Sequence, residues 1–142
     1  MLQIAFSPVA HVEETATQRY INAGACNLPA WLAEEYAHDV DYKVRRRIAE
    51  NSSAPRQILQ TLALDEHSEV RIALSENPSA PFSLLALLAA DEDTCVRYDM
   101  ADNPHLPYAI HLILAQDENP YVAARAQAML RICCLCANSM AA

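Results

Sequence analysis

The chain has 142 residues, about the size of one domain, and 53% of them are hydrophobic, which is enough for a continuous core. Its 18 acidic and 10 basic side chains give a formal net charge of −8, which counts against a surface that must neutralise nucleic-acid phosphates. No apolar run is long enough to cross a membrane and the first residues lack the basic start of a signal peptide, so we expect a cytoplasmic protein.

The first twelve residues stand apart from the rest of the chain. Leu2, Ile4 and Phe6 alternate with other residues, which is the pattern of an apolar lid. We expect residues 1–12 to form an N-terminal capping segment.

From residue 13 onward the sequence repeats with a period of 26 residues. Acidic residues keep this spacing at Glu13, Asp39, Asp65, Asp91 and Asp117, and so do columns of Pro, Arg, Asn and Ala. We predict five helical units at 13–38, 39–64, 65–90, 91–116 and 117–142. Such short units cannot bury their apolar faces alone, so they are expected to stack around one core.

Each unit is predicted to hold two short helices. One begins after the acidic turn, where Thr15, Asp41, Asp93 and Asn119 are good N-caps and His67 is the exception. An Asn is expected to end this helix in a left-handed conformation, at Asn51, Asn77 and Asn103. The other helix opens around Pro55, Pro81 or Pro107 and carries an apolar stripe such as Leu84, Leu85 and Leu88.

The last unit departs from this pattern. Met129 and Leu130 replace the Asn-Pro stop, so the helix that starts at Pro120 is expected to run on through Cys136 and to cap the C-terminal end of the stack.

The third unit carries the motif Asp65-x4-Val70-Arg71-x5-Asn77-Pro78-x2-Pro81-x2-Leu84-Leu85-x2-Leu88-Ala89. This motif resembles the leucine-rich repeat variant family and is similar to the wider HEAT-like group, over residues 13–130. The resemblance implies a right-handed α-α superhelix, or solenoid, of alternating α and shorter, partly 3₁₀ helices. One family member carries an iron–sulfur cluster in an N-terminal cysteine-rich segment. No Cys precedes Cys26 here, so the cluster is not expected.

Acidic and Arg residues six apart form a second regular feature. The pairs are Asp39 with Arg45, Asp65 with Arg71, Asp91 with Arg97, and Glu13 with Arg19. In HEAT-like stacks a similar pair forms a ladder of hydrogen bonds along the turns, so we expect a structural role. The alternative is that the Arg row binds an anion.

Three cysteines near the C-terminus are the only candidate metal or redox site. Cys133, Cys134 and Cys136 offer three thiols, whereas a tetrahedral zinc or cluster site needs four ligands. On a helix Cys133 and Cys136 share a face, but Cys134 is offset by about 100°. We expect small apolar side chains here and no cofactor, with metal or redox chemistry as the alternative.

Catalysis has no support in the sequence. Gly24 is the single glycine, which excludes a glycine-rich phosphate loop, and the five His residues have no paired-ligand spacing. We therefore expect a protein that is not an enzyme.

The helices that follow the acidic turns offer a candidate binding face. Its central residues are Tyr20, Arg46, Ile72 and Tyr98, flanked by Tyr121, with an acidic rim of Glu50, Glu76 and Asp102. Aromatic residues beside an Arg are frequent anchors of protein interfaces. The alternative is that this row packs against other helices or is ordinary surface.

The leading hypothesis is a non-enzymatic scaffold that presents a concave helical face to a protein or peptide partner. The acidic rim indicates that this partner carries Lys or Arg. A metal- or redox-linked protein is the second hypothesis and a nucleic-acid-binding HEAT-like protein the third. The sequence leaves the oligomeric state open.

Overall fold

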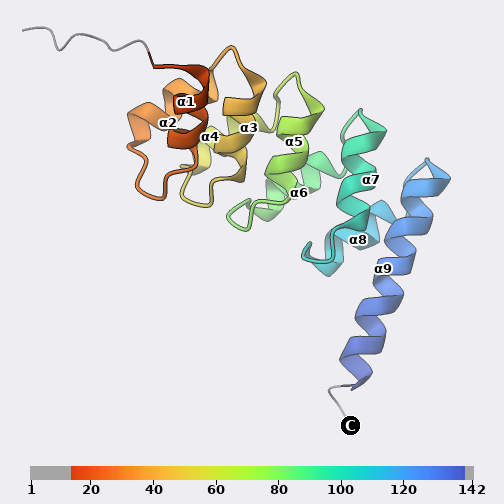
Figure 1. Cartoon of the computed structure of the whole chain (residues 1–142). Coiled ribbons are helices and arrows are strands. Elements are labelled where there is room, and N and C mark those ends of the chain that lie inside the picture. Colours follow the sequence, from red (N-terminus) through yellow and green to blue (C-terminus); the bar gives the residue numbers. More distant parts are fainter. Residues whose placement is uncertain (1–13, 140–142) are drawn as a thin grey trace, which may run out of the picture.

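The computed structural model describes the backbone of residues 14–139 and the side chains of residues 14–132 (Figure 1). The expected lid at 1–12 and Glu13 lie outside the described residues, and so do the side chains of Cys133, Cys134 and Cys136. The described residues contain helices and no strand, so the predicted all-α class is confirmed.

The helices restart every 26 residues in two series. The odd-numbered series is α1 (Ala16–Ala23), α3 (Tyr42–Glu50), α5 (Ser68–Ser75), α7 (Thr94–Asp102) and α9 (Pro120–Ser139). The even-numbered series is α2 (Ala30–Ala37), α4 (Arg56–Leu62), α6 (Phe82–Leu88) and α8 (Tyr108–Leu114). Both series are α-helical, so the partly 3₁₀ helices that the family resemblance implied are not seen in the described residues.

The two series form two layers. The odd-numbered helices lie side by side in one row from α1 to α9, and the even-numbered helices lie behind them (Figure 1). One continuous core separates the layers. Its odd-layer members include three pairs four residues apart, Val44 and Ile48, Val70 and Leu74, and Val96 and Met100, all of them fully buried.

Local sequence explains where the odd-numbered helices begin. The side chains of Thr15, Asp41, Asp93 and Asn119 each accept a hydrogen bond from a backbone N–H of the first turn, as predicted, whereas His67 makes no such bond. The even-numbered helices start one residue after a proline, at Pro29, Pro55, Pro81 and Pro107.

The ends of these helices differ from the prediction. No residue described here has a positive φ, and Asn51 ends α3 with φ −75° and ψ 111°, an extended conformation. The left-handed cap predicted for the Asn column is therefore wrong. An extended Asn turns the chain away from the helix and leaves its side chain free to point inward.

The last helix is the longest. α9 runs for 20 residues and extends beyond the neighbouring helices of the row (Figure 1). Its first half packs against α7 and α8, with Val122 and Ala126 fully buried. Because no Asn-Pro pair interrupts it, the helix continues past Met129, where the preceding units stop.

Candidate interaction surface

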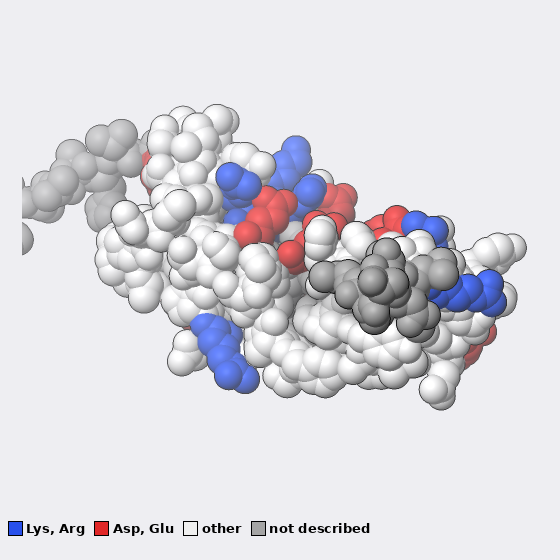
Figure 2. Space-filling view, turned by 90° about the horizontal axis from the view of Figure 1, so that it is seen from below, with Lys and Arg blue, Asp and Glu red and all other residues white. Residues whose placement is uncertain are grey.

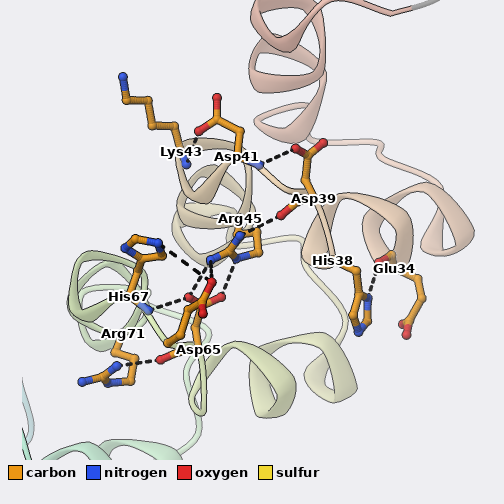
Figure 3. A network of polar contacts seen from close by, with 10 residues as sticks. Glu34, His38, Asp39, Asp41, Lys43, Arg45, Asp65, His67 and Arg71 are labelled. Carbon is orange, nitrogen blue, oxygen red and sulfur yellow. Dashed lines mark hydrogen bonds and ion pairs between the residues drawn. The ribbon is translucent and has the colours of Figure 1, made fainter.

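A ladder of Arg and Asp side chains joins each unit to the next along the turns that precede the odd-numbered helices. Arg45 Nε donates to Asp65 Oδ2 at 2.7 Å (Figure 3), and Arg71 Nε donates to Asp91 Oδ2 at 2.8 Å. The same geometry links Arg19 to Asp39 and Arg97 to Asp117. Each Asp thus pairs with the Arg of the preceding unit, 20 residues earlier.

The Asp six residues before Arg45, Arg71 or Arg97 bonds to that Arg only through its backbone carbonyl oxygen. Arg45 Nη1 donates to the carbonyl oxygen of Asp39, and Arg71 Nη1 to that of Asp65 (Figure 3). The sequence correctly singled out the residue types, but the carboxylate partner comes from the next unit. In Arg71 each of the three guanidinium nitrogens donates a hydrogen bond within the protein.

The ladder is nearly removed from water. The side chains of Arg71 and Asp91 are 9% and 6% exposed. Hydrogen bonding to Asp91 raises the pKa of Arg71 above its ordinary value, although burial alone would lower it. Loss of either partner would leave the other charge buried and unpaired, which is a costly state.

A second ladder, of Asn side chains, runs along the opposite turns. Asn51 Nδ2 donates to the carbonyl oxygens of Ala23 and Ala25, and Asn77 Nδ2 donates to those of Ala49 and Asn51. The Oδ1 atom of each Asn also accepts from a backbone N–H two residues later. This Asn column is visible in the sequence, but the role of left-handed helix cap predicted for it is wrong. A side chain that bonds the preceding unit has no local sequence signal besides its recurrence at Asn51, Asn77 and Asn103.

The N-terminal half of the predicted binding face is occupied by ion pairs. Arg46 lies between Glu50 on its own helix and Glu69 on α5, at 3.1 and 3.5 Å. Arg47, which the sequence analysis did not select, donates to Glu50 at 2.9 Å and lies over the ring of Tyr20, with 5.6 Å to its centroid. These contacts satisfy the charges of Arg46 and Glu50 within the protein itself.

The middle of the face is part of the packing. Ile72 is half-buried and packs against the hydrophobic core. Two other members of the row are more exposed, Tyr20 two units before Ile72 and Tyr98 one unit after it, each 43% exposed. The row is therefore not one uniform surface, and Ile72 serves the core as well as the face.

An open hollow lies between the start of α7 and the start of α9. It has a volume of about 330 Å³ and is lined by Thr94, Cys95, Tyr98, Asp99, Asn119 and Tyr121. Tyr121 is 76% exposed, which makes it one of the most exposed aromatic side chains of residues 14–132. Tyr98 and Tyr121, two of the five central and flanking residues predicted for the face, thus line the same hollow.

The electrostatics of this hollow favour a cation. Although Asp99 is exposed, partial loss of its hydration, together with the nearby Asp102, raises the pKa of its carboxyl. Asp99 has no ion-pair partner among the residues described. An aromatic pair beside an unpaired carboxylate suits a Lys or Arg side chain, because the ring face and the carboxylate both attract positive charge.

Cys95 lies in the same hollow as a protonated thiol. The charge of Asp93 raises the pKa of Cys95, and a thiol is a poor nucleophile compared with a thiolate. Covalent chemistry through Cys95 is therefore disfavoured.

The acidic rim is weaker than the sequence indicates. Glu50 is neutralised by Arg46 and Arg47, and Asp102 forms an ion pair with Arg125 of α9. Glu76 has no ion pair within the described region. Arg47 and Arg125 occupy a repeat position that does not belong to the predicted face. Their ion pairs with the acidic rim could therefore not be predicted from the repeat pattern.

Two further findings bear on other classes of protein. No group of His, Cys, Asp and Glu in the described part could hold a metal ion. Within that same part, no helix has both the length and the apolar character needed to cross a membrane.

Comparison with protein-family models, with curated proteins and with solved structures finds no match.

Proposed function

We propose that this protein is a non-enzymatic interaction scaffold, an α-solenoid of five 26-residue units that binds a protein or peptide through its odd-numbered helices. The helix starts, which recur every 26 residues, and the two ladders between units support the solenoid. The likeness of the motif at residues 65–91 to leucine-rich repeat variants agrees with this proposal. A cytoplasmic location fits the same proposal.

The packing of the two layers supports a concave odd-numbered face. The odd-numbered helices pack on their neighbours along the whole row, whereas the even-numbered helices pack closely on each other only at α2 and α4. A stack bends toward the layer whose elements are closer together. The inner surface of such a curve would then carry Tyr20, Arg46, Tyr98 and Tyr121.

The observation that carries the proposal is the hollow of Tyr98, Asp99 and Tyr121. It combines exposed aromatic area with a carboxylate that no described cation neutralises. We propose that the partner is a basic peptide segment whose Lys or Arg side chain enters this hollow. Tyr20 and Arg46 at the other end of the face would contact the remainder of the segment.

A displayed library of random peptides tests this function. We expect selected peptides to be enriched in Lys and Arg. The double substitution Tyr98→Ala and Tyr121→Ala should cost about 2 kcal/mol of binding, which is roughly 30-fold in Kd, because both side chains supply contact area in the hollow. Isothermal titration calorimetry with a selected peptide measures this loss.

The matched control is Trp31→Ala, which removes an aromatic side chain of comparable exposure, 68%, from the other layer. It should leave the Kd unchanged. A library without basic enrichment, or an equal loss in the Trp31 variant, contradicts the proposed face. Circular dichroism must show that both variants keep their helices.

A further inference from the structure

Two places on the odd-numbered face carry a Tyr and an Arg in the same repeat positions. Tyr20 of α1 and Arg47 of α3 stand three units before Tyr98 of α7 and Arg125 of α9. Because the units stack with the same spacing, each Arg could be expected to cover the ring of its Tyr. Of the two, only Arg47 does so.

In the first pair of helices the chain holds a complete site for a guanidinium. Arg47 lies over Tyr20, with 5.6 Å from its guanidinium carbon to the ring centroid, and its Nη1 donates to Glu50 at 2.9 Å. Gly24 leaves the room for this pose, because a Cβ atom there would lie 2.5 Å from Arg47 Nε. An aromatic face, a carboxylate and the absence of an obstructing side chain are thus combined at one place.

In the last pair of helices the equivalent arginine binds elsewhere. Asp102 occupies the position that Gly24 has in the first unit, and its carboxylate forms an ion pair with Arg125. All ten Lys and Arg residues of the chain fall within the described part, and there none of them lies over the ring of Tyr98. This ring is therefore open to a cation from outside the chain.

We propose that the hollow of Tyr98, Asp99 and Tyr121 is a site for an arginine of the partner, which it selects over lysine. This inference rests on the proposed function and names the residue that the basic segment inserts. The guanidinium lies over the Tyr98 ring and donates to Asp99, in the way that an arginine of the chain itself is bound in the first pair of helices. Asp99 is available for this contact, since it forms no ion pair among residues 14–132.

The physical reason for the selection is the shape and hydration of the two cations. A guanidinium is planar, so its face can stack on a ring while the N–H groups at its edge donate to a carboxylate. A lysine ammonium is compact and strongly hydrated, and it loses more of its hydration when it contacts a tyrosine ring. Tyr121, which lines the same hollow, adds apolar surface for the alkyl part of the arginine.

Asp102 keeps the chain's own arginine out of this hollow. Viewed from below, most charged side chains lie along one side of the molecule, with basic side chains next to acidic ones (Figure 2). The pair of Arg125 and Asp102 is a contact of this kind between α9 and α7. Without the Asp102 side chain, Arg125 has both the reach and the room to cover Tyr98, because its equivalent Arg47 covers a ring from the same repeat position.

Fluorescence anisotropy with two labelled peptides tests the arginine site. One peptide alternates Arg with Gly and the other alternates Lys with Gly at the same length, so long-range attraction to the acidic chain is equal for both. We expect the Arg peptide to bind at least about fivefold more tightly. Tyr98→Leu should abolish this preference. Tyr108→Leu, at a tyrosine of α8 with similar exposure, 49% against 43%, should preserve it.

A second pair of variants uses the chain's own arginine as a competitor. Asp102→Gly frees Arg125 to cover the ring, so the preference for the Arg peptide should fall below about twofold. Asp102→Gly combined with Arg125→Ala should restore the preference of the parent chain. Glu35→Gln removes the same charge from an exposed position of the other layer and should leave the preference unchanged. Circular dichroism checks that each variant keeps its helices.

The outcomes separate this inference from the proposed function. Equal affinities for the two peptides that still fall in the Tyr98 variant overturn the selection of arginine and leave the peptide-binding face standing. If neither peptide binds, both proposals are overturned. A double variant that remains as indifferent to the two peptides as Asp102→Gly alone would show that Arg125 is not the competitor and would refute the role given to Asp102.

Discussion

His111 is a titratable side chain at a core position that holds an apolar residue in other units. The equivalent residues one and two units earlier are Leu85 and Leu59, both buried. His111 is 1% exposed, and neither of its ring nitrogens makes a well-formed hydrogen bond, although the backbone carbonyls of Pro107 and Asn103 lie near enough to favour the charged ring. Burial lowers the pKa of His111 below its ordinary value, because the charged imidazolium loses its hydration.

This burial predicts a specific pH dependence of stability. The unfolded chain binds the His111 proton at about pH 6.5, whereas the folded chain binds it only at lower pH. The free energy of unfolding should therefore be fully retained above about pH 6.5 and should fall as the pH drops below that value. His111→Leu should remove this part of the decline and raise the stability at neutral pH by about 1 kcal/mol, since no polar nitrogen is then left buried.

Urea unfolding at pH 7.5 and pH 5.5 measures both effects. The exposed His105 is the control, and His105→Gln should leave the decline between the two pH values intact. A His111→Leu variant that is less stable at neutral pH, or that declines as steeply as the parent chain, would show that the ring is satisfied by contacts the structure does not contain.

At the scale of the elements, the two ladders decide how one helix pair joins the next. The Arg–Asp ladder bonds the turns before the odd-numbered helices, and the Asn ladder bonds the turns after them. Neighbouring units are thus tied together by the Arg–Asp contacts along the whole row, and by the Asn contacts at Asn51 and Asn77 in its first half. Because these contacts are directional, they define the register between units more strictly than apolar packing alone.

Arg71→Ala tests the first ladder in the centre of the chain. The substitution leaves Asp91 buried without its cation, which should cost roughly 3 kcal/mol. We expect the melting temperature to fall by at least about 4 °C, measured by circular dichroism or calorimetry.

Arg125→Ala, which breaks a more exposed pair with Asp102, is the comparison and should change the melting temperature much less. If Arg71→Ala keeps its stability but loses binding to a peptide, the Arg row is a binding site and its structural role is refuted.

For the whole molecule, the regular spacing of the helices makes one unit removable. Deletion of residues 65–90 joins Leu64 to Asp91, which brings Asp91 into the position that Asp65 holds beside Arg45. We expect the shortened chain to keep its fraction of helix per residue and to melt cooperatively at a lower temperature, because one interface between units is lost.

Deletion of residues 65–77 alone is the control, since it removes α5 and puts the even-numbered α6 directly after α4, where an odd-numbered helix belongs. This variant should lose most of its helical signal. If both deletions unfold the chain, or both are tolerated, the 26-residue unit is not the unit of folding.

The sequence alone determined the helical class and the starts of the helices. Thr15, Asp41, Asp93 and the prolines act on backbone groups within a few residues of themselves, so their effect can be read locally. The apolar stripes that form the core could be predicted for the same reason, because the helical period places them on one face.

Only the tertiary structure decided what lies between units. Arg45 pairs with a carboxylate 20 residues away, and Asn51 donates to a carbonyl 28 residues away. The residues next to Arg45 and Asn51 in the sequence do not indicate these partners. Likewise, Arg125 neutralises Asp102, while Tyr98 and Tyr121 meet in one hollow, because stacking sets helices from neighbouring units side by side. Periodicity shows that residues are equivalent, but the distance between units decides which side chains touch.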